Sequence, residues 1–267
     1  MALRFVDNSG DQVNFGAPAS AATLPIGTVA FWIKPANVSN SLRQIFTKSV
    51  TAGPNGWKVF RRGATGTVYA IQVSRSVTHQ VVDTGATMTA SEWQMVFFMW
   101  NVTSGGPKAY RGTLVTPPVE VTTAGNNGSG TQVDDSASDI CLGTDDGGTT
   151  ASIPADIAWA ALWNRNLTPS DTEQVFQATR SRIFGPVPLN LLIPPGLMLH
   201  TFLGEMGANT QIDYSSYANR GTVTTATVCG PTILPFPTSP VWAATLARPW
   251  PSAPAGRLSR LSLLGAG

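Results

Sequence analysis

Between residues 3 and 163 the sequence is a series of short runs rich in Val, Ile, Phe, Trp and Thr, separated by clusters of turn-forming residues. The clusters include DNSGD at 7–11, GPNG at 53–56 and GNNGSG at 125–130. Apolar side chains do not recur at helical spacing anywhere in this region. Many short strands separated by such turns favour an all-β sandwich or barrel. We expect strands at residues 28–34, 42–47, 57–62, 67–74, 93–101, 108–113, 139–142 and 156–163.

One helix is expected directly after these strands. Thr168 supplies an N-cap hydroxyl, Pro169 occupies the first helical position, and Asp171 follows three residues after the cap. Val175 and Phe176 give the helix an apolar side, and it should end near residue 181 or 182. This helix closes the first domain, which we place at residues 1–182.

The composition changes after residue 183. Residues 183–267 hold 11 of the 20 prolines of the chain but only six charged side chains. Proline at this density argues against central strands and long helices, while the many apolar residues argue against polar disorder. We therefore predict an extended, Pro-rich arm at 183–267 that lies against protein surface. Its candidate contact residues are Trp242, Trp250, Phe236 and Leu261.

Charge and cysteine content exclude several classes of protein. Only 12% of residues are charged and the formal net charge is +2, with no run of Lys or Arg, so we expect no nucleic-acid partner. No apolar stretch reaches the roughly 18 residues that span a membrane. The N-terminus lacks the features of a signal peptide, which predicts synthesis in a bacterial cytoplasm. Two cysteines without CxxC spacing predict neither a disulfide framework nor a metal site.

Seven motifs in the correct order resemble the laminin G-like and concanavalin A-like lectin family. They are ALRF at 2–5 with QVNF at 12–15, GTVAFWIKP at 27–35, IFTK at 45–48 with GWKV at 56–59, WQMV at 93–96, YRGTLV at 110–115, LG at 142–143 and IAWAALWNRNLT at 157–168. The resemblance implies a two-sheet antiparallel jelly-roll sandwich over residues 1–182. Ala158 and Arg111 stand where the family has Asp and Asn, at positions that shape the rim where many relatives bind calcium or ligand. We therefore expect no metal and no cofactor.

A second resemblance lies in the predicted arm. HTFL at 200–203 followed by DYSSYANRGT at 213–222 is similar to an element that usually precedes the first strand in this family. Because the termini of a jelly roll can lie close together, its position after the closing helix is structurally acceptable. A trailing copy followed by a Pro-rich tail resembles lectin-like proteins encoded among bacteriophage structural genes.

Catalytic patterns are absent from the sequence. Related glycoside hydrolases need two carboxylates across a cleft, but the ExDxxE pattern is missing and the glutamates at 92, 120, 173 and 205 have no acidic partner at i+2 or i+4. The two histidines, His79 and His200, accompany neither a GxSxG nor an HExxH motif. We expect that the protein is not an enzyme.

Two polar loops are candidates for ligand binding. The segment TDDGGTT at 144–150 is interpreted as a solvated hairpin turn, with a calcium loop or a sialidase-type turn as alternatives. The candidate ligand-binding residues are Asp145, Asp146, Asn126 and Asn127. Most of the eight tryptophans fall in predicted strands, where the core is their expected place, so at most one or two are free to meet a glycan.

Two strands are apolar on both faces, at 93–100 (WQMVFFMW) and 157–163 (IAWAALW). Their outward side chains must be covered by the arm or by another subunit, or be buried within the domain. The leading hypothesis is a bacteriophage virion protein, a capsid decoration or cement protein whose arm clamps neighbouring copies or the major capsid protein. It would be a homo-oligomer located in the virion. The alternative is a glycan-binding head- or tail-fibre lectin that recognises the host surface.

Overall fold

The computed structural model describes residues 2–7, 10–38, 42–50, 55–62, 68–85, 88–121, 125–147, 152–180, 196–203 and 210–229. Runs of β-branched and aromatic residues form the strands expected between residues 28 and 163, and the turn clusters separate them. The strands are β1 (Ala2–Phe5), β2 (Gln12–Asn14), β3 (Ile26–Pro35), β4 (Arg43–Lys48), β5 (Trp57–Arg61), β6 (Tyr69–Val73), β7 (Gln80–Asp83), β8 (Gln94–Asn101), β9 (Lys108–Thr113), β10 (Val119–Glu120), β11 (Ile140–Leu142), β12 (Ala155–Trp163), β13 (Leu197–Phe202), β14 (Thr210–Gln211), β15 (Gly221–Thr224) and β16 (Thr227–Cys229).

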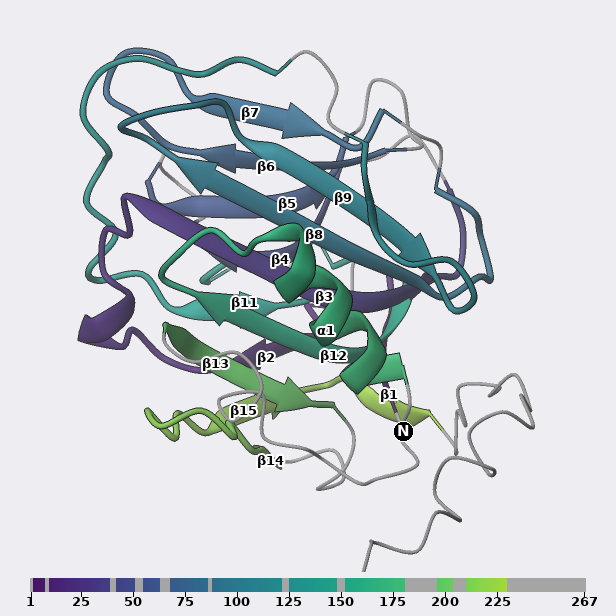
Figure 1. The fold of residues 1–267 in the computed structure, drawn as a ribbon. Helices are drawn as coiled ribbons and strands as arrows, with labels where there is room; N and C mark the ends of the chain where they lie inside the picture. The colour runs from purple at the N-terminus through teal and green to yellow at the C-terminus, as the bar shows by residue number, and fades with distance from the viewer. Residues whose placement is uncertain are drawn as a thin grey trace, which may run out of the picture. The chain divides into compact units, whose positions relative to one another are not determined.

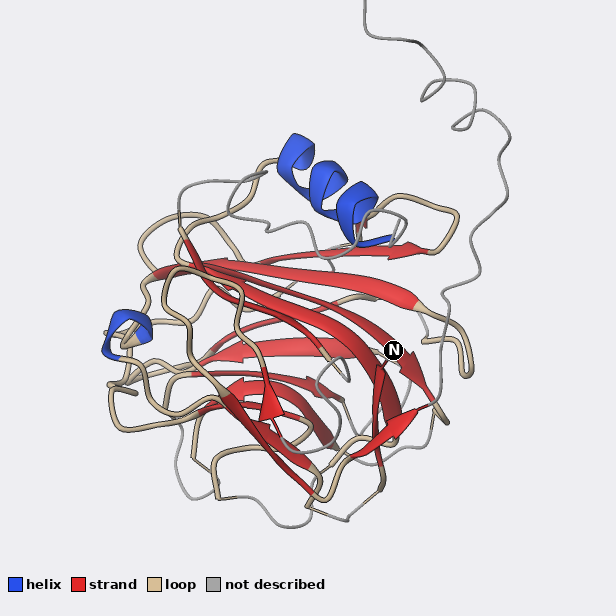
Figure 2. Ribbon diagram, turned by 90° about the horizontal axis from the view of Figure 1, so that it is seen from below, coloured by secondary structure: helices blue, strands red, loops and turns tan. Residues whose placement is uncertain are grey.

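The strands make two antiparallel sheets that lie face to face (Figures 1 and 2). The first sheet has the order β10-β9-β8-β3-β12-β1-β16, and β13 also pairs with β12. The second has the order β14-β15-β2-β11-β4-β5-β6-β7. Neighbours that are far apart in sequence, such as β3 with β8 and β12, are typical of a jelly roll. The predicted fold, a two-sheet antiparallel sandwich, is confirmed.

The main core lies between the two sheets. Alternate residues of each strand point inward, as period-2 geometry requires. On β8 the inward residues are Val96, Phe98 and Trp100, and they join a cluster that includes Trp57 and Val59 of β5. The rings of Trp57 and Trp100 lie 5.6 Å apart between their centroids. Large aromatic side chains therefore fill the space between the sheets.

A second apolar cluster lies on the outer face of the first sheet, where α1 (Pro169–Arg180) covers it (Figure 2). Met95, Phe97 and Met99, the alternate residues of β8, belong to this cluster. Trp32 of β3 packs against Phe176 of the helix, with ring centroids 6.0 Å apart. The strands that are apolar on both faces are thus covered within this chain, by α1 and by Leu197, Phe202 and Tyr214 from the segment that the sequence assigned to the arm.

The N-terminus of α1 has the expected cap. The backbone N–H of Asp171 donates to Thr168 Oγ1 over 3.2 Å, and the backbone N–H of Thr168 donates to Asp171 Oδ2 over 2.8 Å. This reciprocal pair satisfies two donors that a helix start leaves free. Arg165 adds an ion pair to the same carboxylate, and the resulting hydrogen bonds hold the pKa of Asp171 below its usual value even though partial burial raises it.

The structure differs from the expected domain boundary at residue 182. Residues 196–229, which the sequence analysis placed in the arm, contribute β13 to the first sheet and β15 to the second, and β16 pairs with β1. The physical reason is the distribution of proline: the 11 prolines after residue 183 fall at 186–195 and 231–254, and none lies between 196 and 230. Backbone N–H groups are therefore available for ladders. The arm residues Trp242, Trp250, Phe236 and Leu261 lie outside the described residues.

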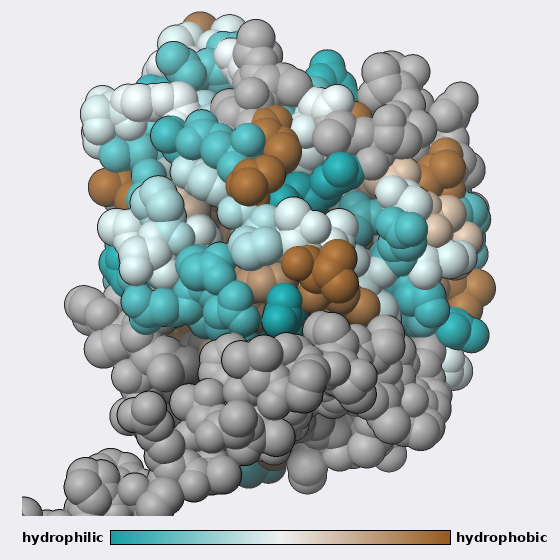
Figure 3. Space-filling view, turned by 45° about the vertical axis from the view of Figure 1, so that its right-hand side comes forward, coloured by the Kyte–Doolittle hydropathy of each residue, from teal (hydrophilic) through white to brown (hydrophobic). Residues whose placement is uncertain are grey.

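The described surface exposes few large hydrophobic side chains: Val6, Leu42, Val77, Val115, Val119 and Tyr217. On the face drawn in Figure 3, hydrophobic residues form separate small groups among hydrophilic ones. No helix in the described part of the chain is long and apolar enough to cross a membrane.

Candidate functional site

The structure does not bring the two predicted ligand loops together. Asp146 forms an isolated bridge with Val50, next to the end of β4, whereas Asn126 forms a bridge with Val81 on β7. β5 and β6 lie between β4 and β7 in the second sheet. At about 4.8 Å per spacing, β4 and β7 are roughly 14 Å apart across the sheet, and the two loops lie beyond these strands on opposite sides. They cannot form one site for a single sugar ring.

Asp145 and Asp146 are tied to neighbouring segments. Asp145 is 6% exposed, and its backbone oxygen accepts a hydrogen bond from Gln12 Nε2 over 3.2 Å. Asp146 Oδ2 accepts the backbone N–H of Asp139 over 3.1 Å, and its own N–H donates to the backbone oxygen of Ser49. These contacts hold the loop against β4 and β2. β11 pairs with β2 and β4, whereas the next strand, β12, belongs to the first sheet, so the segment connects the two sheets and is not the solvated hairpin turn expected from the sequence.

Asn126 and Asn127 extend the edge of the second sheet. Asn126 exchanges two backbone hydrogen bonds of 2.8 Å with Val81, and its side-chain oxygen accepts the N–H of Gly128. The backbone oxygen of Asn127 accepts from Arg75 Nη1 over 3.1 Å. Both asparagines are exposed, so their side chains are accessible even though the backbone is fixed.

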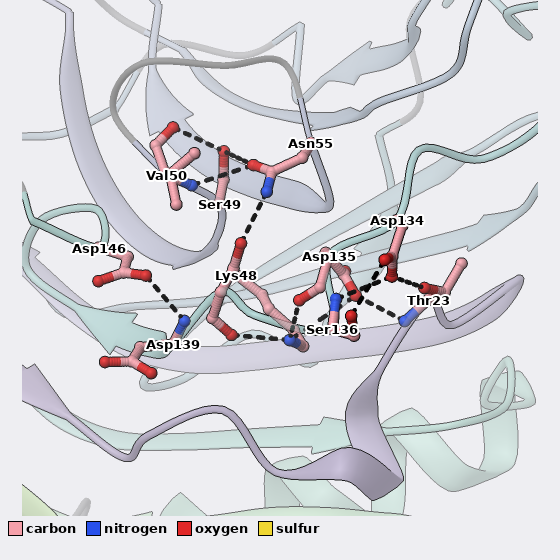
Figure 4. Close-up of polar contacts among 11 residues, drawn as sticks. Thr23, Lys48, Ser49, Val50, Asn55, Asp134, Asp135, Ser136, Asp139 and Asp146 are labelled. Atoms are coloured by element: carbon pink, nitrogen blue, oxygen red, sulfur yellow. Dashed lines mark hydrogen bonds and ion pairs between the residues drawn. The ribbon is translucent and has the colours of Figure 1, made fainter.

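A buried polar network fixes the segment that precedes β11 (Figure 4). Lys48 Nζ donates to the backbone oxygens of Asp135 (2.6 Å) and Ser138 (2.8 Å) and forms an ion pair with Asp135 Oδ1 at 3.7 Å. Both side chains of the pair are fully buried. Burial lowers the pKa of Lys48 and raises that of Asp135. The Thr23 backbone N–H also donates to Asp135 Oδ1 over 2.6 Å.

The chemistry of this network is structural. Its lysine and its main carboxylate neutralise each other inside the protein and are closed to solvent. Asn55 completes the network, because its Nδ2 donates to Ser138 Oγ over 2.7 Å while its side-chain oxygen accepts the N–H of Val50. In the described residues, no group of three or more His, Cys, Asp or Glu side chains is arranged to hold a metal ion.

The glutamates that the structure describes are not paired as hydrolase carboxylates. Glu120 Oε2 accepts from Tyr110 Oη and Lys108 Nζ. Glu173 accepts from Gln177 on the same helix. Glu92 lies on an exposed turn before β8. No two of these three come from neighbouring strands that face one cleft.

Aromatic side chains, the usual stacking platforms for sugar rings, are almost all inside the fold. The six tryptophans in the described residues are all buried. Tyr214 is partly exposed. Tyr217 is 46% exposed, more than any other aromatic side chain in the described part of the chain. If an aromatic platform operates on this surface, Tyr217 is the residue that can provide it.

Tyr217 lies on a turn between β14 and β15 that one carboxylate organises (Figure 1). Asp213 Oδ1 accepts the N–H groups of His200 (2.9 Å) and Ser215 (2.8 Å). Asp213 Oδ2 accepts Ser215 Oγ–H (2.8 Å) and the backbone N–H and Nδ2–H of Asn219 (3.0 and 3.2 Å). A carboxylate with this many donors fixes the backbone of the turn on both sides of Tyr217.

The same turn is docked on β13. Tyr214 N–H donates to the backbone oxygen of His200 over 2.7 Å, and the Ser215 hydroxyl proton is shared between Asp213 Oδ2 and the backbone oxygen of Met198, which lies 3.1 Å from Oγ. Ala218 adopts a φ of +50°, an uncommon conformation for a residue with a Cβ, and its N–H closes the turn onto the oxygen of Ser215. The position of the Tyr217 backbone is therefore set by the fold.

The sequence pattern indicates this element but does not single out Tyr217. The motif DYSSYANRGT was identified by resemblance and assigned to the arm, although Asp, Ser and Asn at 213, 215 and 219 are the residue types that build side-chain-to-backbone turns. That spacing, with a tyrosine inside it, was the available signal. What no pattern could show was that the other aromatic residues would be less exposed.

Comparison with known proteins gives the family. The model described as "Concanavalin A-like lectin/glucanases superfamily" matches residues 7–172, more than half of the chain. Comparison with curated proteins gives no match.

Solved structures are similar to this chain at low sequence identity. A putative carbohydrate-binding protein from Bacteroides ovatus superposes with a TM-score of 0.56 at 13% identity, over 85% of this chain and 58% of that one. The SAP-like pentraxin of Limulus polyphemus gives 0.48 at 17% identity, over 66% and 81% of the two chains. Domains LG4-5 of the mouse laminin alpha1 chain give 0.45 at 13% identity, over 63% and 43%. The chain spans little more than half of the Bacteroides protein. With its two-sheet sandwich and closing helix, this chain belongs to the laminin G-like branch of the concanavalin A-like lectin/glucanases superfamily.

Proposed function

We propose that the protein is a glycan-binding module and that Tyr217 is the platform on which a sugar ring stacks. The observation that carries the proposal is the exposure of this one aromatic side chain on a turn that Asp213 holds in place. The fold is one that lectins use, and a solved structure with the same fold is described as a putative carbohydrate-binding protein. Fold alone does not choose a function, so the turn carries the argument.

Binding follows from two properties of this turn. Tyrosine offers a large amphipathic ring with little side-chain entropy to lose. Because the backbone is already ordered by its hydrogen bonds, little further ordering opposes association. Ser216 and Arg220 are exposed on either side of Tyr217, and Arg220 makes no ion pair within the described residues. They supply hydrogen-bond donors for sugar hydroxyl groups.

A glycan array tests the proposal on the full-length protein. We expect selective signals for a group of related glycans, loss of at least tenfold in affinity for Tyr217→Ala, and retention for Tyr217→Phe, which keeps the ring. Val77→Ala, at a side chain 72% exposed elsewhere, is the matched control. An array without signal above background, or equal binding by Tyr217→Ala and wild type, contradicts the proposal.

The proposal contains no catalytic step. The similar structure from Bacteroides ovatus is described as a putative carbohydrate-binding protein, which agrees with binding and not with turnover. The described glutamates are occupied by local contacts or isolated on the surface. We expect no hydrolysis of any glycan that the array identifies, measured by reducing-end release over a day.

A second proposal places this module in a bacteriophage virion, as a capsid decoration protein or as a head- or tail-fibre lectin. The low charge content and the Pro-rich, apolar sequence after residue 230 favour it. The strands that are apolar on both faces no longer support it, because α1 covers the outer cluster. A chain that ends at Cys229 tests the arm: loss of co-sedimentation with assembled particles supports a clamp to capsid protein or neighbouring copies, and unchanged co-sedimentation contradicts it.

A further inference from the structure

His200 is a buried titratable group joined directly to the turn that presents Tyr217. Its side chain is fully buried among aromatic rings, with centroid distances of 5.1 Å to Phe202, 5.8 Å to Tyr214 and 6.1 Å to Trp159. Neither ring nitrogen has a hydrogen-bond partner. A neutral imidazole tolerates this environment, whereas an imidazolium would be a desolvated charge without a counter-ion.

The backbone of the same residue supports the turn through two hydrogen bonds. Its N–H donates to Asp213 Oδ1, and its carbonyl oxygen accepts the N–H of Tyr214. Ser215 adds a third bond, to Met198 two residues earlier on β13. A displacement of β13 at His200 therefore breaks the contacts that hold the turn.

We propose that His200 makes the glycan-binding turn sensitive to acid: protonation of the imidazole opens the contact between β13 and the 213–219 turn, and the bound glycan is released. The inference rests on the proposed function of Tyr217. It concerns a local opening at β13 and the turn, distinct from unfolding of the whole sandwich.

The direction follows from linkage. Burial lowers the pKa of His200 from 6.5 to about 3, so the closed state binds its proton less readily than an open state in which the ring meets water. The closed state is fully favoured above about pH 6.5, and each pH unit below that value shifts the equilibrium about tenfold toward the open state. At pH 4.5 the shift is about a hundredfold.

The effect of protonating His200 must be distinguished from that of other titratable groups on the elements packed against it. Asp213 accepts the His200 N–H and Tyr214 packs against the ring; Trp159 of β12 and Phe202 of β13 carry no titratable group. Burial is the cause of the lowered His200 pKa. A variant that removes only the imidazole therefore distinguishes its titration from that of the Asp213 carboxylate.

Hydrogen exchange on the full-length protein tests the inference without any ligand. We expect the protection factors of amides in residues 213–219, corrected for intrinsic rates, to fall about tenfold per pH unit from 6.5 to 4.5, while amides of β8 stay protected. In His200→Phe the same amides should keep constant protection. His200→Gln, which is smaller and also does not titrate in this range, serves if the phenylalanine variant fails to fold. The inference is overturned if these amides lose protection equally in wild type and variant. It is also overturned if they lose it together with the β8 amides, or if they lose none.

Binding is then measured with the immobilised glycan that gives the strongest array signal. We expect the ratio of affinities at pH 7 and pH 5 to be at least tenfold for wild type and near one for His200→Phe. A glycan that binds equally at both pH values overturns the acid sensitivity and leaves the proposed function standing. An array without signal contradicts the proposed function, while the exchange experiment still decides whether the turn responds to acid.

Discussion

Replacing Lys48 with methionine should destabilise the sandwich more than most single substitutions. Methionine occupies much of the volume of the lysine stem but has neither the charge nor the N–H groups. Asp135 would then be a fully buried carboxylate without its ion pair, and the backbone oxygens of Asp135 and Ser138 would lose the donors that now lie at 2.6 and 2.8 Å.

The expected loss is about 3–5 kcal/mol in the free energy of unfolding at pH 7, because removal of one partner of a buried pair leaves the other charge uncompensated. That is a large part of the roughly 5–15 kcal/mol that stabilises a typical domain. Each lost hydrogen bond from a charged donor accounts for about 1.5–3 kcal/mol of this total.

The loss should also depend on pH in a defined direction. In Lys48→Met, burial without a counter-charge raises the pKa of Asp135 above the raised value it already has in the native protein. A carboxyl group whose pKa is higher in the folded state than in the unfolded state stabilises the fold at pH values below its unfolded-state pKa. This stabilisation is lost as the pH rises through its folded-state pKa. The variant should therefore recover stability relative to wild type between pH 7 and pH 4.

Urea denaturation followed by tryptophan fluorescence at pH 7, 5.5 and 4 measures the effect. The control is Lys48→Met with Asp135→Asn, whose amide oxygen still accepts the Thr23 N–H but carries no charge. We expect the double variant to be more stable than the single variant at pH 7, with little dependence on pH. A loss below about 1 kcal/mol, or a single variant without the acid recovery, refutes the account of the pair.

Three further predictions concern the helix, the turn and a buried tyrosine of β9. Phe176→Ala should lower the free energy of unfolding by about 3–5 kcal/mol, because it removes a fully buried ring packed on Trp32; denaturant titration against exposed Val77→Ala checks this. Asp213→Asn should cost about 2–4 kcal/mol and speed amide exchange in residues 213–219, since an amide group cannot accept every donor on the carboxylate; unchanged exchange contradicts it. Burial and the Glu120 carboxylate raise the pKa of Tyr110 to about 12, so Glu120→Gln should lower it, and an NMR titration without a downward shift shows that burial alone is responsible.

The strand series shows how much the local pattern specifies. Short β-branched and aromatic runs between turn clusters predicted eight of the strands from residue 28 to 163 but not β7 and β10, and the Thr168 cap with Pro169 predicted where α1 begins. These features depend on neighbouring residues only, since period-2 alternation and capping operate within a few residues of chain. The pattern could not say what covered the outward side chains of β8, because that partner, α1, is distant in sequence.

The end of the domain was decided by tertiary contacts. Averaged over residues 183–267, proline content indicated an extended arm, but the 196–229 stretch without proline pairs with β12, β2 and β1. Composition averaged over a long window conceals a short segment whose N–H groups are free to pair.

Some features of the candidate site follow from the sequence alone, and others only from the fold. By itself the sequence determined the sandwich, the capped helix and the residue types of the 213–222 turn, because propensity, capping and turn chemistry act locally. Only the tertiary structure decided that the Asp145–Asp146 and Asn126–Asn127 loops lie apart and that Tyr217 is exposed on a turn attached to His200. Those outcomes depend on which strands become neighbours and which side chains lose contact with water, and both are properties of the folded chain as a whole.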